Sequence, residues 1–259
     1  MIVKARDGTS LNVDIRGKAG APLVVFVNPL GSDLGFWDKV VQDFEDFQTV
    51  RFDFRGTGRS GTSQSAASIE VFANDVLDIL DALDCRKAHF VGLSLGGMIG
   101  MWLGAAAPQH FGRMVLANTT PHIPLRDMWN SRIQQARNGE LEKIAAETGA
   151  RWTSEAFRQN HPDEYAKFVK TFASTPIEGY VGCCEVLRDT DLRDTLPRIK
   201  LPVRIIGGQM DLASSREIAA QMAQSIPGAD CQIIPGAGHL TNIESTSTFN
   251  ALVREWVAG

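Results

Sequence analysis

The chain has 259 residues, with 26 Lys and Arg against 30 Asp and Glu, so its formal net charge is −4. A mildly acidic chain without clusters of Lys or Arg lacks the concentrated positive charge that binds a phosphate backbone, which argues against nucleic-acid binding. The longest uninterrupted apolar run, Leu23–Val27, is far shorter than the about 20 residues that span a bilayer, so no membrane-spanning segment is expected.

The N-terminal part of the chain is typical of β-strands joined by short connections. Two short strands, residues 2–5 and 11–16, flank the turn-forming pair Asp7-Gly8. The continuous apolar run Leu23–Val27 is typical of a strand buried on both faces, and residues 50–54 form a further strand. Because the first strands are joined too tightly for crossover helices, we expect them to form an antiparallel edge.

Strands and helices then alternate along the chain. Apolar residues at helical spacing over residues 69–83 are followed by a strand at 88–92, a helix at 98–107 and a strand at 113–118. Near the C-terminus the expected strands are residues 203–207 and 231–234, and the expected helices are residues 214–225 and 247–257. This alternation predicts an α/β protein with a mostly parallel eight-stranded sheet flanked by helices.

One long segment interrupts this alternation. Between Thr120 and Pro197 there is no convincing buried strand, but there are five helical patterns, at residues 127–136, 141–147, 154–159, 165–172 and 179–187. Because the segment falls between two strands of one sheet, we expect a helical cap over one end of the sheet rather than helices on its flank. The expected domains are a core of residues 1–120 and 198–259 and a cap of residues 121–197.

The segment Gly92-Leu93-Ser94-Leu95-Gly96 fits the pattern G-x-S-x-G and lies between a predicted strand and a predicted helix. A serine on such a sharp turn requires residues without side chains two positions before and two positions after it. The helix that begins at Leu95 directs unpaired N–H groups toward the serine and favours negative charge there. We therefore expect Ser94 to be a catalytic nucleophile rather than an incidental serine in a Gly-rich turn.

A serine hydroxyl is a weak nucleophile without a base, and the chain has five histidines. Only His239 and His122 follow predicted strands, and parallel sheets place their active sites at the carboxyl ends of strands. His239 also follows every candidate acid, which matches the order serine, acid, histidine expected on such a fold. We expect His239 to be the base and consider His122 a candidate lining residue of the pocket.

The imidazole needs a carboxylate to hold its tautomer and to stabilise its charged form. Asp211 comes directly after a predicted strand, whereas the equivalent position one strand earlier is Asn118, which cannot carry charge. Asp53 also ends a strand, but Arg55 two residues later suggests an internal ion pair. We therefore expect Asp211 to be the acid.

An oxyanion formed during attack by the serine must be met by backbone N–H groups. One donor should be Leu95, the residue after the nucleophile. The second should come from the loop after the strand Leu23–Val27, which begins Asn28-Pro29-Leu30. Because Pro29 has no N–H, Leu30 is the expected donor.

These features together resemble the α/β-hydrolases over the whole chain, and residues 52–60 match the D-x-R-G-x-G-x-S loop of that family. Asn28 and Pro29 replace the His-Gly that is common in the family's oxyanion loop. Within the family the chain is most similar to the 3-oxoadipate enol-lactonases of aromatic catabolism. That similarity lies in residues 28–34 with Trp37, residues 93–100, and two segments of the predicted cap, residues 129–133 and 179–184.

The resemblance implies hydrolysis of a small anionic lactone by Ser94, His239 and Asp211, without a metal or organic cofactor. A net-negative protein then needs a local cation for the substrate's carboxylate. Arg132 is our candidate, because it follows Trp129 by three residues and so shares its helical face. In the alternative interpretation Arg132 is exposed to solvent and Trp129 only anchors the cap.

Trp37 and Met98 are candidates for the acyl side of the pocket, although large apolar residues are equally typical of a core. The same triad would also serve a general carboxylesterase or a cofactor-free perhydrolase. A ligand-binding receptor on a hydrolase scaffold is the non-enzymatic alternative, since a fold does not determine function.

The first eight residues lack the positive segment and long apolar stretch of a signal peptide, so we expect a cytoplasmic protein, either a monomer or a small homo-oligomer. The cysteines are scattered and lack metal-ligand spacing, and we expect all four to be reduced and buried: Cys85, Cys183, Cys184 and Cys231.

Overall fold

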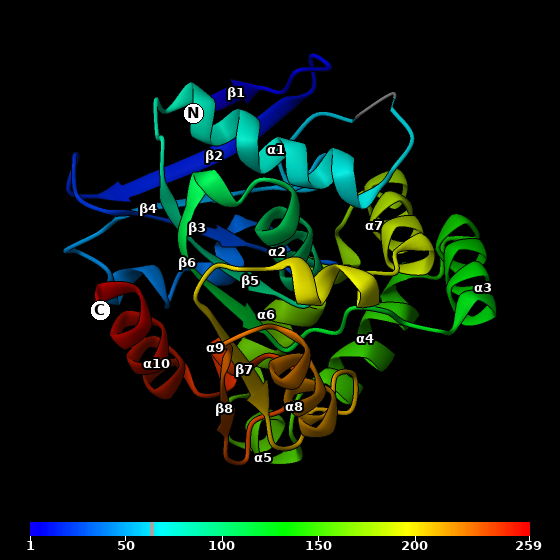
Figure 1. Cartoon of the computed structure of the whole chain (residues 1–259). Helices are drawn as coiled ribbons and strands as arrows, with labels where there is room; N and C mark the ends of the chain where they lie inside the picture. The colour runs from blue at the N-terminus through cyan, green and yellow to red at the C-terminus, as the bar shows by residue number, and fades with distance from the viewer. Residues whose placement is uncertain (63–64) are drawn as a thin grey trace.

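The computed structural model describes residues 1–62 and 65–259 (Figure 1). Its described strands form one eight-stranded sheet in the order β1-β2-β4-β3-β5-β6-β7-β8. The strands are β1 (Ile2–Lys4), β2 (Ser10–Gly17), β3 (Leu23–Val27), β4 (Gln48–Phe52), β5 (Ala88–Leu93), β6 (Phe111–Ala117), β7 (Val203–Gly208) and β8 (Asp230–Ile234). Strands β1 and β2 pair antiparallel, as does β2 with β4, and every pair from β4 to β8 is parallel. The predicted fold class and the predicted antiparallel edge are both confirmed.

The position of each strand in the sheet explains its residue pattern. Strand β3 lies between β4 and β5, and all five of its side chains are buried, as the continuous apolar run predicts. Strand β2 lies near the edge, and its burial alternates along the first part of the strand. Because these strands are parallel, the carboxyl ends of β3, β5, β6, β7 and β8 lie side by side at the same end of the sheet.

The helices outside the long insertion are α1 (Ile69–Ala82), α2 (Leu95–Ala106), α8 (Arg216–Ser225), α9 (Thr241–Glu244) and α10 (Thr246–Ala258). Helix α1 begins where the Ser68 hydroxyl accepts a hydrogen bond from the Val71 N–H, and it buries apolar residues at helical spacing. Within the described ranges, no helix combines the length and the apolar character needed to cross a membrane.

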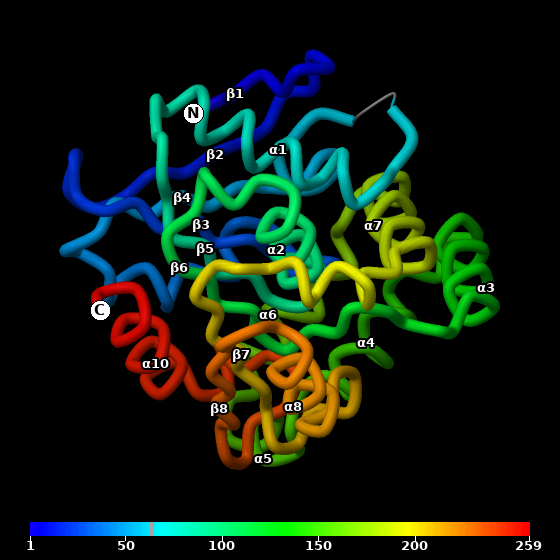
Figure 2. The backbone as a smooth tube through the Cα atoms, viewed as in Figure 1, coloured from blue at the N-terminus to red at the C-terminus, as the bar shows by residue number. Residues whose placement is uncertain are grey.

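Five α-helices separate β6 from β7: α3 (Arg126–Arg137), α4 (Leu141–Trp152), α5 (Glu155–Asn160), α6 (Pro162–Ala173) and α7 (Ile177–Asp189). Figure 2 shows the chain leaving β6 for these helices and returning from α7 toward β7. Helix α3 packs against α7, and α4 packs against α6. The five predicted helices are therefore present between two strands of one sheet, while the domain boundaries at 120/121 and 197/198 stay predictions.

Helix α4 is longer than its sequence pattern predicts. The predicted segment ends at residue 147, and the two residues that follow it, Thr148 and Gly149, are poor helix formers. A Cβ added at Gly149 would lie 2.8 Å from Cγ2 of Val169 on α6, so the glycine allows the two helices to approach closely. Packing between α4 and α6 therefore allows α4 to continue to Trp152, so that Arg151 and Trp152 belong to this helix.

The predicted ion pair between Asp53 and Arg55 is wrong. Arg55 instead pairs with Asp75 of α1, with 2.5 Å between Nη2 and Oδ1. The Asp53 carboxylate accepts hydrogen bonds from the backbone N–H groups of Leu34 and Arg59. The Asn12 side-chain amide also donates to this carboxylate, so backbone and amide donors rather than the nearest cation satisfy it.

All four cysteines are free, as predicted, but only two of them are fully buried. Cys183 and Cys184 are buried within α7, and burial raises the pKa of the Cys184 thiol to about 12. Cys85 and Cys231 are half-buried, so the expectation that every cysteine is buried is wrong for these two.

Candidate active site

Ser94 lies on the turn between β5 and α2 with φ 56° and ψ −112°, a conformation that costs a residue with a side chain. A Cβ added at Gly92 would lie 2.3 Å from the carbonyl oxygen of Gly96. A Cβ added at Gly96 would lie 2.2 Å from the carbonyl oxygen of Val27 at the end of β3. Both glycines of the pattern G-x-S-x-G are therefore required by close backbone approach.

Gly96→Ala should lower the free energy of unfolding by about 3 kcal/mol or more, because the added methyl group meets backbone that cannot move aside. Gly182→Ala on α7 is the matched control, since among the described residues its Cβ would meet Ala67 alone, at an ordinary contact distance of 3.6 Å. We expect the control variant to be as stable as wild type or about 1 kcal/mol more stable. Urea unfolding of both variants checks this, and equal losses would contradict the steric explanation.

The predicted acid and base are in direct contact. His239 Nδ1 lies 2.9 Å from Oδ2 of Asp211, and both side chains are buried. The carboxylate also accepts hydrogen bonds from the Ser214 hydroxyl, the Asn118 amide and the backbone N–H of Ala213. Burial acts to raise the pKa of Asp211, but the charge and hydrogen bond of His239 and the surrounding donors outweigh it, so this pKa is well below its usual value.

Asn118, rejected as the acid, holds the acid in place. It occupies the position after β6 with a left-handed φ of 44°, which asparagine tolerates better than most residues. Its side-chain amide donates to Asp211 Oδ2 at 3.0 Å, and its side-chain oxygen accepts from the Thr241 hydroxyl at 2.6 Å. The sequence signal for this role was the polar residue at the carboxyl end of a strand.

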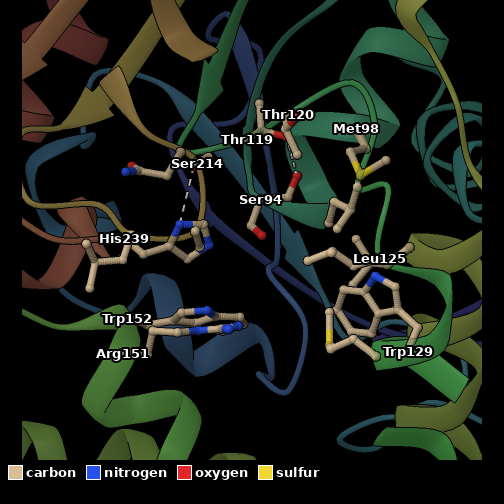
Figure 3. Close-up of a pocket in the computed structure, with 16 residues that line it drawn as sticks. Ser94, Met98, Thr119, Thr120, Leu125, Trp129, Arg151, Trp152, Ser214 and His239 are labelled. Atoms are coloured by element: carbon tan, nitrogen blue, oxygen red, sulfur yellow. Dashed lines mark hydrogen bonds between the residues drawn. The ribbon is translucent and has the colours of Figure 1, made fainter. Parts of the chain in front are cut away.

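The second nitrogen of the imidazole is unpaired. His239 Nε2 is buried and has no hydrogen-bond partner in the described part of the chain. The Trp152 ring packs against the imidazole with centroids 4.8 Å apart, and the His239 N–H donates to the Trp152 carbonyl. In Figure 3 the Ser94 side chain lies beside this ring. One nitrogen held by a carboxylate and the other unpaired suit His239 to act as a base.

The two predicted oxyanion donors, Leu30 and Leu95, are buried residues. Leu95 is the first residue of α2, and Leu30 lies in the loop after β3. No hydrogen bond within the described chain takes up either backbone N–H. The loop packs closely against α6, since a Cβ added at Gly31 would lie 2.3 Å from Cδ2 of Phe172.

A cavity of about 120 Å³ lies beside Ser94 and His239. Its lining combines residues of the sheet end with residues of α3, α4 and α7. The apolar part of the lining is formed by Met98, Ile123, Leu125, Met128, Leu187 and Leu212. Arg151 and the indoles of Trp129 and Trp152 line the same cavity, so it has both an apolar and a polar wall.

Of the residues predicted to line the substrate pocket, Trp129 and Met98 line this cavity. Trp37 lies instead in the core, where its indole N–H donates to the Asn28 side chain at 2.9 Å. His122 lines a different cavity, and its Nδ1 lies 3.2 Å from the Thr190 carbonyl oxygen. Neither residue lines the cavity beside Ser94.

Arg132 is also absent from the residues that line the cavity. Its guanidinium donates hydrogen bonds to the hydroxyl groups of Tyr180 on α7 and Thr148 on α4. It therefore ties three helices together, and the structure does not support the prediction that it faces the substrate. Arg151 lines the cavity instead, and sequence reasoning missed it because the predicted α4 ended before it.

Among the described residues, no group of three or more His, Cys, Asp or Glu side chains could hold a metal ion.

Residues 22–246 match the family model described as alpha/beta hydrolase fold. The chain is a member of the α/β-hydrolase family. This α/β-hydrolase is 34% identical to 3-oxoadipate enol-lactonase 1 of Acinetobacter baylyi, over 96% of this chain and 93% of that protein. The crystal structure of the enol-lactonase from Burkholderia xenovorans LB400 superposes with a TM-score of 0.96 at 32% identity, with both chains covered completely. The predicted resemblance to the enol-lactonases is confirmed.

A more distant relative of this α/β-hydrolase is the putative carbamate hydrolase RutD of Agrobacterium fabrum. It is 26% identical over 95% of this chain and 98% of that protein. Membership of the family and its enol-lactonase relatives support a hydrolase activity for this chain.

Proposed function

We propose that this protein is a serine hydrolase that opens 3-oxoadipate enol-lactone to 3-oxoadipate, a step of the β-ketoadipate pathway of aromatic catabolism. The observation that carries the proposal is the Asp211–His239 pair beside Ser94 on its sharp turn. The 34% identity to a 3-oxoadipate enol-lactonase supports the choice of substrate. The proposed roles are nucleophile for Ser94, base for His239 and orienting acid for Asp211.

In the first step the Ser94 hydroxyl attacks the ring carbonyl carbon and passes its proton to Nε2 of His239. The backbone N–H groups of Leu30 and Leu95 stabilise the oxyanion that forms. The ring C–O bond then breaks, and His239 returns the proton to the departing oxygen. Because the ester is cyclic, the enol stays attached to the acyl group on Ser94 and converts to a ketone.

In the second step water attacks the acyl-enzyme and gives its proton to His239. The bond between the acyl carbon and Ser94 Oγ breaks, Ser94 regains a proton, and 3-oxoadipate leaves. An enol is a better leaving group than an alkoxide, so the demand on His239 as an acid is modest in the first step.

The test is the ultraviolet decay of 3-oxoadipate enol-lactone with purified protein, measured in parallel with p-nitrophenyl acetate. We expect kcat/KM for the lactone to exceed that for the ester by about a thousandfold, which is about 4 kcal/mol of selective transition-state binding. The Ser94→Ala variant controls for contaminating hydrolases. Comparable values for the two substrates would assign the protein to the general carboxylesterases instead.

A further inference from the structure

The cavity beside Ser94 has two walls of different chemistry. In Figure 3, His239 with Trp152 and Arg151 lies to one side of Ser94, and Met98, Leu125 and Trp129 lie to the other. The first wall carries hydrogen-bond donors and a cation, and the second is mostly apolar. A substrate that contacts both walls therefore meets hydrogen-bond donors and a cation at one end and mostly apolar side chains at the other.

Arg151 is the cation that this cavity offers to a ligand. No hydrogen bond or ion pair within the described residues involves its guanidinium, whereas nearby Arg132 is held by Tyr180 and Thr148. Burial and the charge of Arg132 lower the pKa of Arg151, and the Asp211 carboxylate opposes this. Arg151 is exposed to solvent as well as to the cavity, so a bound carboxylate would give its guanidinium a charged partner in place of water.

Trp152 supplies an unused donor on the same wall. Its indole N–H is buried, with only 5% of the residue exposed, and has no hydrogen-bond partner in the described chain. Buried polar groups are rarely left unpaired, and an indole N–H can only donate. An oxygen atom of a ligand in the cavity that Trp152 lines would satisfy it.

The position of His239 relates this wall to the reaction. After attack by Ser94, His239 Nε2 must deliver a proton to the departing oxygen, so that oxygen lies on the histidine side of the nucleophile. Trp152 packs on the His239 ring at 4.8 Å, and Arg151 precedes it at the end of α4. The donor wall is therefore the wall that the leaving group faces, and the apolar wall faces the acyl group.

We propose that Arg151 and the indole N–H of Trp152 form a carboxylate subsite on the leaving-group side of Ser94. The enzyme then selects esters and lactones whose alcohol or enol half, rather than acyl half, carries a carboxylate. The inference rests on the proposed function only for the roles of Ser94 and His239. It agrees with the proposed lactone, in which a single CH₂ group joins the carboxylate to the enol carbon that bears the departing oxygen.

The subsite predicts a further activity on open-chain acyl esters of 3-hydroxy acids. With 3-acetoxypropanoate, Ser94 would take the acetyl group while the bond to the 3-hydroxypropanoate oxygen breaks and His239 protonates that oxygen. Water would then release acetate from Ser94. Monomethyl succinate is an isomer of this ester with the same number of carbons between carboxylate and ester, but its carboxylate lies in the acyl half.

The experiment compares kcat/KM for these two isomers, each divided by its rate constant for alkaline hydrolysis to remove intrinsic reactivity. We expect wild type to prefer 3-acetoxypropanoate by tenfold or more. Arg151→Ala should reduce the preference to within about twofold, chiefly through a higher KM for 3-acetoxypropanoate. Arg137→Ala is the matched control, because this arginine is exposed like Arg151 but does not line the cavity, and it lies 3.7 Å from Glu178.

Two tryptophan variants separate the indole donor from the ring. Trp152→Phe keeps an aromatic ring against His239 but removes the N–H, so the preference should fall by threefold or more. Trp129→Phe removes the other unpartnered indole N–H of the cavity, from the opposite wall, and should change both isomers alike.

A preference for monomethyl succinate, hydrolysis of neither isomer, or a preference that Arg151→Ala leaves unchanged would overturn the subsite. Assays of 3-oxoadipate enol-lactone on the same preparations separate the two proposals. A preference for 3-acetoxypropanoate without turnover of the lactone would uphold the subsite and reject the lactone as substrate. Turnover of the lactone without any preference between the isomers would reject the subsite and retain the lactonase.

Discussion

Ser94→Ala should lower kcat for the enol-lactone by about a millionfold, the loss typical of removing a nucleophile that works as a unit with its base. The expected reason is that the acyl-enzyme cannot form, while the cavity and the pair of Asp211 and His239 stay in place. Since the residues act together, His239→Ala added to Ser94→Ala should cause little further loss. A large additional loss would mean that His239 promotes direct attack by water.

The same position also tests the strained backbone. Ser94→Gly should be as inactive as Ser94→Ala but about 1 kcal/mol more stable, because glycine adopts φ 56° and ψ −112° without the steric cost of a Cβ. The greater freedom of glycine in the unfolded chain offsets part of the gain. Thermal unfolding of the two inactive variants measures the difference, and an equal or lower Tm for the glycine variant would contradict the strain.

Asp211→Asn should lower kcat by about ten-thousandfold, because an amide at this position favours the wrong tautomer of His239 and does not stabilise its charged form. The protein should still fold, since Ser214 and Asn118 can hydrogen-bond an amide in the same place. Steady-state kinetics with the enol-lactone give the loss, and circular dichroism checks the fold.

Asn118 allows a sharper version of this test. Its side chain lies 3.0 Å from Asp211 Oδ2, so Asn118→Asp in the Asp211→Asn background places a carboxylate beside the missing one and should recover activity by tenfold or more. Asn118→Asp alone should lower activity at acidic pH. It brings two carboxylates into contact, so one of them binds a proton as the pH falls, and the plot of kcat against pH loses activity on its acid side.

In wild type, protonation of Asp211 should cause no such loss of activity at acidic pH, because the pKa of this carboxyl lies well below its usual value and the group stays ionised. A profile unchanged by Asn118→Asp, together with no recovery in the double variant, would show that Asn118 has only a structural role.

Local sequence determined the features that depend on a few neighbouring residues. The turn at Ser94 needs glycine at positions 92 and 96, and the five-residue pattern G-x-S-x-G contains both. The buried strand Leu23–Val27 likewise follows from its continuous apolar run, and the eight-stranded sheet follows from the alternation of strands and helices. The positions of Asp211 and His239 after predicted strands were enough to predict that the two residues pair, and in the structure His239 Nδ1 lies 2.9 Å from Asp211 Oδ2.

Tertiary structure alone decided which polar side chains have partners. Arg132 and Arg151 carry the same charge on the neighbouring helices α3 and α4, but Arg132 meets the hydroxyl of Tyr180, 48 positions away in the chain. Arg151 meets no such partner among the described residues and faces the cavity. The sequence contains no local signal for this difference, because hydrogen bonds between helices depend on how the helices pack and not on the spacing within either one.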